Sequence, residues 1–255
     1  MKEIKKLIDV SCFTGNWPFI HLRYGNIEVL EKKLAAINVT KAFISPVEAI
    51  LEQDPIRANR EMLKLVTGNI FSPVPVVDLS YQNWEDCMDI AVNDGRVKMV
   101  KLIPNYHMYK MYEKDMDKLV AYAKSKGLVI SIQLTVEDPR GQYPLMKVER
   151  VHHYDVVKTL ALFPEQTFIL HNSSMNDLPF YMGALKNVYV DISYLERQDI
   201  MAVLHKEYSL DKFLFASHMP FFFPDGSLNK LKYANVDIDE VEKVAYKNAT
   251  GIFNL

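Results

Sequence analysis

The sequence predicts an α/β protein folded as a single (β/α)8 TIM barrel. Eight short runs of β-branched and apolar residues alternate along the chain with helical patterns. The runs are almost continuously apolar, as in strands buried on both faces of a parallel sheet that helices cover. The length of 255 residues suits one barrel. No linker, repeat or low-complexity tract divides the chain, so one domain is expected over residues 1–255.

The expected strands cover residues 7–13, 41–47, 71–78, 99–104, 128–134, 167–171, 188–193 and 213–218. Helical periodicity marks residues 28–37, 55–66, 84–92, 113–126 and 238–249. The fourth of these helices stops at Gly127, a residue typical of helix C-termini. An open doubly wound sheet would carry a glycine-rich phosphate turn after its first strand, and residues 11–19 contain none.

Composition excludes several classes of partner. The formal net charge is -2, so no basic surface for nucleic acid is expected. No apolar run reaches the ~18 residues of a membrane span, and no signal peptide is expected. Two cysteines, Cys12 and Cys87, make a disulfide framework implausible. We expect a cytoplasmic protein that acts on a small molecule, with homo-oligomer formation left open.

Polar residues gather where the predicted strands end, which is the functional face of such barrels. His171 and His218 each end a buried strand, and His107 follows another, so these three are the predicted catalytic residues. Buried histidines can also be hydrogen-bonded core residues. The predicted substrate-binding residues are Ser11, Phe13, Trp17, Asn105, Tyr106, Gln133, Glu137, Asp138, Arg140, Asn172, Asp191 and Glu196. Some of them have structural alternatives: Trp17 as a cover over the barrel mouth, and Asp138 with Arg140 as a loop ion pair.

Four segments resemble the amidohydrolase superfamily. They are IDVSCFTG (8–15), TFILHN (167–172), FLFASHMP (213–220) and AYKNATGIF (245–253). Rim motifs GNWPF (15–19), PNYHMY (104–109), EDPRGQYPL (137–145) and SHMPFFF (217–223) are similar to an uncharacterised branch of that superfamily. The resemblance covers nearly the whole chain and implies the same barrel.

The resemblance also implies where a divalent metal would bind, and most of those positions are changed. They fall on Ser11, Phe13, Gln133, His171 and His218, of which only His171 is unchanged. A catalytic zinc site needs about three His, Asp, Glu or Cys ligands, so no metal cofactor is expected. Cys12 should point away from the barrel axis and cannot substitute. The alternative is zinc or another divalent metal in a rebuilt site, where Glu137, Asp138 or His107 joins the two strand-end histidines.

Three functions remain open at this point. The first is a metal-independent hydrolase of a lactone or ester, similar to a lactonase branch of the superfamily, with His218 as general base. His171 or His107 would polarise the carbonyl, and Arg140 would pair with a substrate carboxylate. The second is a metallohydrolase with the rebuilt site. The third is a non-catalytic barrel, which a mouth sealed by Trp17 and Phe221 would favour.

Overall fold

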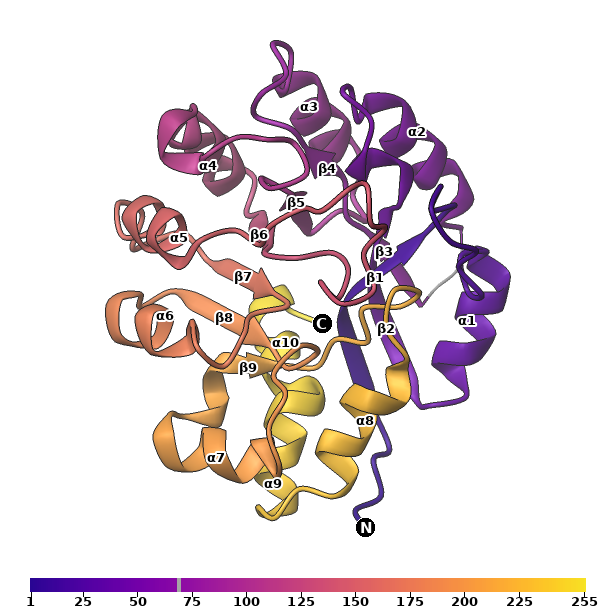
Figure 1. Ribbon diagram of the computed structural model, residues 1–255, viewed down its shortest axis with the longest axis vertical. Helices are drawn as coiled ribbons and strands as arrows, with labels where there is room; N and C mark the ends of the chain where they lie inside the picture. The colour runs from indigo at the N-terminus through magenta and orange to yellow at the C-terminus, as the bar shows by residue number, and fades with distance from the viewer. Residues whose placement is uncertain (68–69) are drawn as a thin grey trace.

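The structure is a computed structural model that describes residues 1–67 and 70–255, and it confirms the barrel. Strands occupy the centre and helices surround them (Figure 1). The strands are β1 (Leu7–Thr14), β2 (Val39–Pro46), β3 (Phe71–Pro73), β4 (Val76–Val77), β5 (Met99–Leu102), β6 (Val129–Gln133), β7 (Phe168–His171), β8 (Val188–Asp191) and β9 (Phe213–Leu214). All pairings are parallel, in the orders β1-β2-β3 and β4-β5-β6-β7-β8-β9.

Backbone hydrogen bonds join these two groups into one barrel. The expected strand 71–78 is divided into β3 and β4, which pair with different neighbours. Val74 N–H still donates to the Ile44 carbonyl at 2.8 Å, and Lys101 N–H donates to the Pro75 carbonyl at 2.9 Å. On the other side, Val10 N–H donates to the Phe215 carbonyl at 3.0 Å, which links β1 to the chain after β9.

The surrounding helices are α1 (Ile27–Ala35), α2 (Ile56–Leu65), α3 (Glu85–Asn93), α4 (Met116–Ser125), α5 (His153–Leu160), α6 (Leu178–Ala184), α7 (Ile200–Glu207), α8 (Pro224–Lys232), α9 (Ile238–Glu242) and α10 (Asn248–Phe253). The 3-10 turns are η1 (Glu48–Ile50), η2 (Met111–Glu113) and η3 (Leu210–Lys212), and η4 (Lys243–Lys247) is a π-helical turn. The expected helix 238–249 therefore continues to Phe253 through a π turn. Gly127 ends α4 in the left-handed region, as predicted. In the described part of the chain, no helix has the length and apolar character needed to span a membrane.

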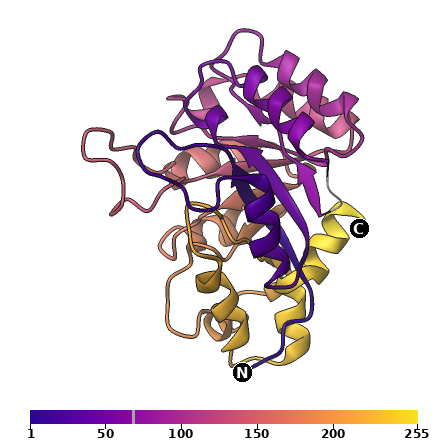
Figure 2. The ribbon, with the colours of Figure 1, turned by 90° about the vertical axis from the view of Figure 1, so that its right-hand side faces the viewer.

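One end of the barrel is filled with apolar side chains. The inner face of the strands carries Ile8, Val10, Phe43, Val74, Met99, Val129, Ile169, Leu214 and Ala216 there. Helix α10 closes this end, and its Phe253 ring lies 4.0 Å from the Phe43 ring. Loops 15–26 and 137–150 project from the opposite end (Figure 2). The mouth, where the strands end, is therefore the place to look for a functional site.

Candidate active site at the centre of the barrel

The inner face changes from apolar to polar toward the carboxyl ends of the strands. Side chains two positions apart on a strand share a face, so Lys101 follows Met99 inward, and His171 follows Ile169. The polar inner residues, all fully buried, are Ser11, Ser45, Lys101, Ser131, Gln133, His171, Asp191 and His218. Seven strand segments thus direct hydrogen-bonding side chains toward the inside of the barrel.

His171 and Asp191 form a hydrogen-bonded pair between β7 and β8. His171 Nδ1 lies 2.8 Å from Asp191 Oδ2. Burial lowers the pKa of His171 to about 4, and the nearby Lys101 charge lowers it further, against the opposing effect of Asp191. The imidazole is therefore neutral at pH 7. Because the carboxylate accepts, Nδ1 carries the proton and Nε2 holds a lone pair.

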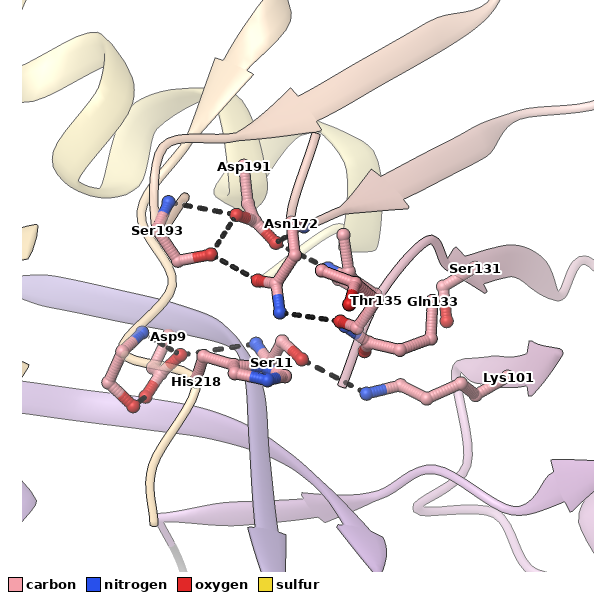
Figure 3. Close-up of polar contacts among 12 residues, drawn as sticks. Asp9, Ser11, Lys101, Ser131, Gln133, Thr135, Asn172, Asp191, Ser193 and His218 are labelled. Carbon is pink, nitrogen blue, oxygen red and sulfur yellow. Dashed lines mark hydrogen bonds and ion pairs between the residues drawn. The ribbon is translucent and has the colours of Figure 1, made fainter. Parts of the chain in front are cut away.

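Further donors hold Asp191 in its ionised form. The Asn172 and Ser193 backbone N–H groups donate to it at 3.3 and 2.9 Å, and the Ser193 hydroxyl also donates (Figure 3). Burial alone would raise the pKa of Asp191, but hydrogen bonds from His171 and Ser193 bring it below the ordinary value. The carboxylate therefore fixes the orientation of the His171 ring.

His218 follows β9, the strand that pairs with β8. Its Nε2 is 2.6 Å from the Val136 carbonyl, which can only accept, so Nε2 carries the proton and Nδ1 the lone pair. Burial lowers the pKa of His218 to about 3. His218 has φ +52° and Asn172 has φ +58°, left-handed values that are uncommon outside glycine and concentrate at functional sites.

Lys101 is a fully buried lysine that the sequence reasoning missed. Its Nζ donates to Ser11 Oγ at 3.0 Å (Figure 3) and lies 4.1 Å above the Phe13 ring. Burial lowers the pKa of Lys101 to about 7, against the opposing charges of Cys12, Asp191 and Asp9. The signal was present in the sequence: a charged residue in the middle of an apolar strand is rare without a specific role.

Asp9 is a second missed residue, and it joins β1 to the loop after β9. Its carboxylate accepts hydrogen bonds from the Ser11 and Ser217 backbone N–H groups and from the Ser217 hydroxyl. Burial raises the pKa of Asp9 to about 7 despite those donors. Asp9 thus holds the strand that carries Ser11 against the strand that leads to His218.

Four polar atoms at the centre have no hydrogen-bond partner among the described residues. They are Ser45 Oγ, Gln133 Oε1, His171 Nε2 and His218 Nδ1. All four residues are fully buried and lie on the inner face of the barrel. Buried polar groups without a protein partner usually bind water or a ligand.

Aromatic side chains cover the barrel mouth above this centre. The Trp17 and Phe221 rings are 5.3 Å apart, and the Phe221 ring is 5.5 Å from Phe13. Trp17 Nε1 donates to Glu137 at 3.0 Å, and the Tyr106 hydroxyl donates to the same carboxylate at 3.3 Å. The predicted residues Trp17, Tyr106 and Glu137 therefore form one cover, with Phe13 beneath it.

A pocket of about 450 Å³ lies beside this cover. Three predicted residues line it: Asp138, Arg140 and Glu196. Arg140 is exposed and paired with Asp138 at 2.5 Å, so the loop ion pair weighed as an alternative is present. Ser193, which bonds Asp191, and Phe222, whose ring is 4.6 Å from His218, also line the pocket. The pocket thus contains a hydrogen-bond partner of Asp191 and an aromatic neighbour of His218, although neither histidine lines it.

Two predicted residues lie apart from the polar centre. His107 Nε2 is 3.0 Å from the Ala49 carbonyl, and its Nδ1 is 3.7 Å from Asp78. Asn105 donates to the Leu134 and Glu149 carbonyls and lines a separate pocket of about 410 Å³. Their recorded contacts are to loops rather than to the inner face. Both residues were predicted because the motif PNYHMY directly follows a strand. In such a segment a side chain can point away from the barrel axis.

Comparison with known proteins identifies the family and the fold of this chain. The sequence model described as Amidohydrolase matches residues 47–255. The chain belongs to the amidohydrolase family. No curated protein sequence matches it. The family match covers most of the barrel, including β7, β8 and the histidines of the polar centre.

Solved structures share the fold of this amidohydrolase-family chain at low sequence identity. An uncharacterised TIM-barrel protein from Bordetella bronchiseptica is 14% identical, with a TM-score of 0.73 and 98% of each chain covered. The 5-carboxyvanillate decarboxylase LigW from Sphingomonas paucimobilis is 12% identical, with a TM-score of 0.69, over 99% of this chain and 100% of that one. A dihydroxybenzoic acid decarboxylase from Polaromonas sp. JS666, with bound manganese, is 13% identical with a TM-score of 0.68, over 99% and 98%.

The residues of this chain do not fit a divalent metal at the family position. Phe13 offers no donor atom, and the Lys101 amine lies between the Phe13 ring and Ser11. The alternative metal site would use Glu137 or Asp138. Glu137 instead accepts hydrogen bonds from Trp17 and Tyr106, and Asp138 forms an ion pair with Arg140. Among residues 1–67 and 70–255, no three His, Cys, Asp or Glu side chains are grouped so as to hold a metal.

Proposed function

We propose that this amidohydrolase-family chain is a metal-independent hydrolase of small esters or lactones, with His171 as its general base. The observation that supports it is the His171–Asp191 pair at 2.8 Å, with Nε2 unpartnered at the barrel centre. An imidazole in this tautomer can remove a proton from water, and the adjacent carboxylate stabilises the imidazolium that forms.

His171 fits the role of base better than His218, which the sequence favoured. Asp191 is anionic and stabilises a protonated His171, whereas His218 is oriented by the neutral Val136 carbonyl. His218 instead offers Nδ1 as an acceptor for a substrate or for an ordered water.

The Ser11 and Lys101 side chains can stabilise the charge that develops on the carbonyl oxygen. Ser11 Oγ already accepts from Lys101, so its own proton is free to bond an oxyanion. Fixed donors of this kind contribute most in a buried site that excludes water. Esters and lactones suit it better than amides, because an alkoxide leaves more readily than an amine anion.

The pocket of about 450 Å³ is the proposed entry for substrate, past Phe222. Its volume is in the range of small-molecule sites. Arg140 is neutralised by Asp138, so a substrate carboxylate is not required for binding.

A non-catalytic barrel is the second candidate, because the contact of Trp17 with Phe221 closes the mouth. To separate the two, we would measure initial rates on p-nitrophenyl acetate and a panel of γ- and δ-lactones. The protein should be untagged, and its metal content should be measured by elemental analysis. We expect hydrolysis that survives chelator and falls ~100-fold or more in His171→Ala.

His205→Ala, on the exposed face of α7, is the matched control and should retain the full rate. Equal rates in His171→Ala and His205→Ala, or no turnover on any substrate, would favour the non-catalytic barrel. Stoichiometric metal that is required for turnover would overturn metal independence. Aromatic carboxylates belong in the panel because two structural neighbours are named decarboxylases. Release of carbon dioxide instead of hydrolysis would replace the proposed reaction.

A further inference from the structure

Lys101 has the position of a reactive residue rather than that of a structural one. It is fully buried on the inner face of β5, at the level where the barrel becomes polar. Its single recorded hydrogen bond goes to Ser11, and no carboxylate of residues 1–67 and 70–255 forms an ion pair with it. Buried lysines that serve structure are normally paired with a carboxylate.

The surroundings keep the Lys101 amine nucleophilic at neutral pH. The Phe13 ring covers one side of Nζ at 4.1 Å, and water is excluded from the rest. Burial lowers the pKa of Lys101 to about 7, so a large fraction of the amine is unprotonated under ordinary conditions. A desolvated neutral lysine is the form that attacks carbonyl carbon in enzymes.

The unpartnered atoms of the polar centre supply what such an attack needs. His171 Nε2 and His218 Nδ1 both carry lone pairs, and Gln133 Oε1 accepts. The Lys101 charge acts on both imidazoles, so they are the groups available to take a proton from the attacking nitrogen and return it to the departing oxygen.

We propose that Lys101 forms a Schiff base with a small aldehyde or ketone bound at the centre of the barrel. The Nζ lone pair adds to the carbonyl carbon, and one amine proton passes to the oxygen through an imidazole, which gives a carbinolamine. The second amine proton then passes to the hydroxyl group, which leaves as water while the C=N bond forms. No oxidant, reductant or metal takes part. This reactivity uses the neutral form of the same Lys101 that the proposed hydrolysis places beside the carbonyl oxygen, and reductive trapping tests it without measuring hydrolysis.

The test is reductive trapping of the intact chain. The protein is incubated at pH 7.5 with propanal, or separately with benzaldehyde, and then with sodium borohydride, which reduces an imine to a stable secondary amine. Peptide mass spectrometry then locates the adduct. A lysine with a pKa near 7 has about a thousandfold more free amine at pH 7 than a surface lysine, and burial slows its access. We expect Lys101 to be modified at least ~10-fold faster than exposed lysines such as Lys64.

Two variants complete the experiment. Lys101→Arg keeps a cationic side chain but should no longer form the rapidly trapped adduct. Lys64→Arg should still form that adduct at Lys101. The adduct map of the unsubstituted chain decides the question even where Lys101→Arg does not fold. Adducts confined to surface lysines, with Lys101 unmodified in a chain that is folded by circular dichroism, would overturn the proposal.

Discussion

Replacing Lys101 by methionine should stabilise the protein at neutral pH. The unfolded lysine has a pKa of 10.5, and burial lowers the pKa to about 7 in the folded chain. Each pKa unit corresponds to about 1.4 kcal/mol, so the shift corresponds to roughly 5 kcal/mol. Methionine has a similar length, fills the same space beside Phe13 and has no charge to desolvate.

The free energy of unfolding of the unsubstituted chain should rise with pH. Because the folded pKa lies below the unfolded one, the unfolded chain binds more protons between pH 7 and 10.5. The stability of the unsubstituted chain therefore rises with pH across that window, by at most about 1.4 kcal/mol per unit for this one group. The full penalty from the buried lysine is present below pH 7, and the advantage of Lys101→Met should shrink steadily toward pH 10.

Urea unfolding at pH 7.0, 8.0 and 9.0, followed by circular dichroism, measures the stability gained by Lys101→Met and the change of that gain with pH. Lys64→Met on the exposed face of α2 is the matched control and should leave the pH profile of the unsubstituted chain unchanged. A Lys101→Met variant that is less stable at pH 7, or whose advantage does not change with pH, would refute the reasoning. Such a result would mean that Asp9 and Asp191 hold Lys101 as a stabilised ammonium.

Other consequences of the site can be measured separately. Asp191→Asn should lower any hydrolytic rate by about 100-fold or more, since His171 loses its oriented tautomer, and initial rates would check this. Burial lowers the pKa of His171 to about 4, so stability should fall by about 3 kcal/mol as the pH drops from 6.5 to 4, which urea unfolding would detect. Phe253→Ala should destabilise the chain by about 3–5 kcal/mol, seen as a lower urea midpoint, because α10 would no longer fill the barrel end. Trp17→Ala should admit larger esters, measured as a wider range of chain lengths hydrolysed.

The barrel was predictable because its strands are buried on both faces. Runs such as 167–171 contain almost no polar residue until their last position, and that pattern also located His171 and His218. Both proved fully buried at the polar centre. Alternation predicted the directions of residues 11–13, although β1 is irregular between Asp9 and Cys12, where Val10 also faces inward. Cys12 lies among the residues outside the strands, as expected, while Ser11 and Phe13 face inward.

The parts that could not be predicted depend on partners that are distant in sequence. Asp9 is held by Ser217, 208 positions away, and no local pattern shows that pairing. The tautomers of the histidines depend on Asp191 and on the Val136 carbonyl, which are fixed only when the barrel closes. Lys101 lies inside its strand and not at the end, so a search for polar strand ends does not select it, although its place within an apolar run is visible in the sequence.

The polar centre also bears on whether the barrel is active. A buried polar atom without a partner costs about 1–3 kcal/mol, so four of them would cost roughly 4–12 kcal/mol. That is comparable to the whole stability of an ordinary domain, about 5–15 kcal/mol. A barrel kept only as a scaffold would be more stable with apolar residues at Ser45, Gln133, His171 and His218, as it already has at its opposite end. Ordered water or a bound ligand would offset that cost, and a ligand would have to pass the aromatic cover at Trp17 to reach these atoms.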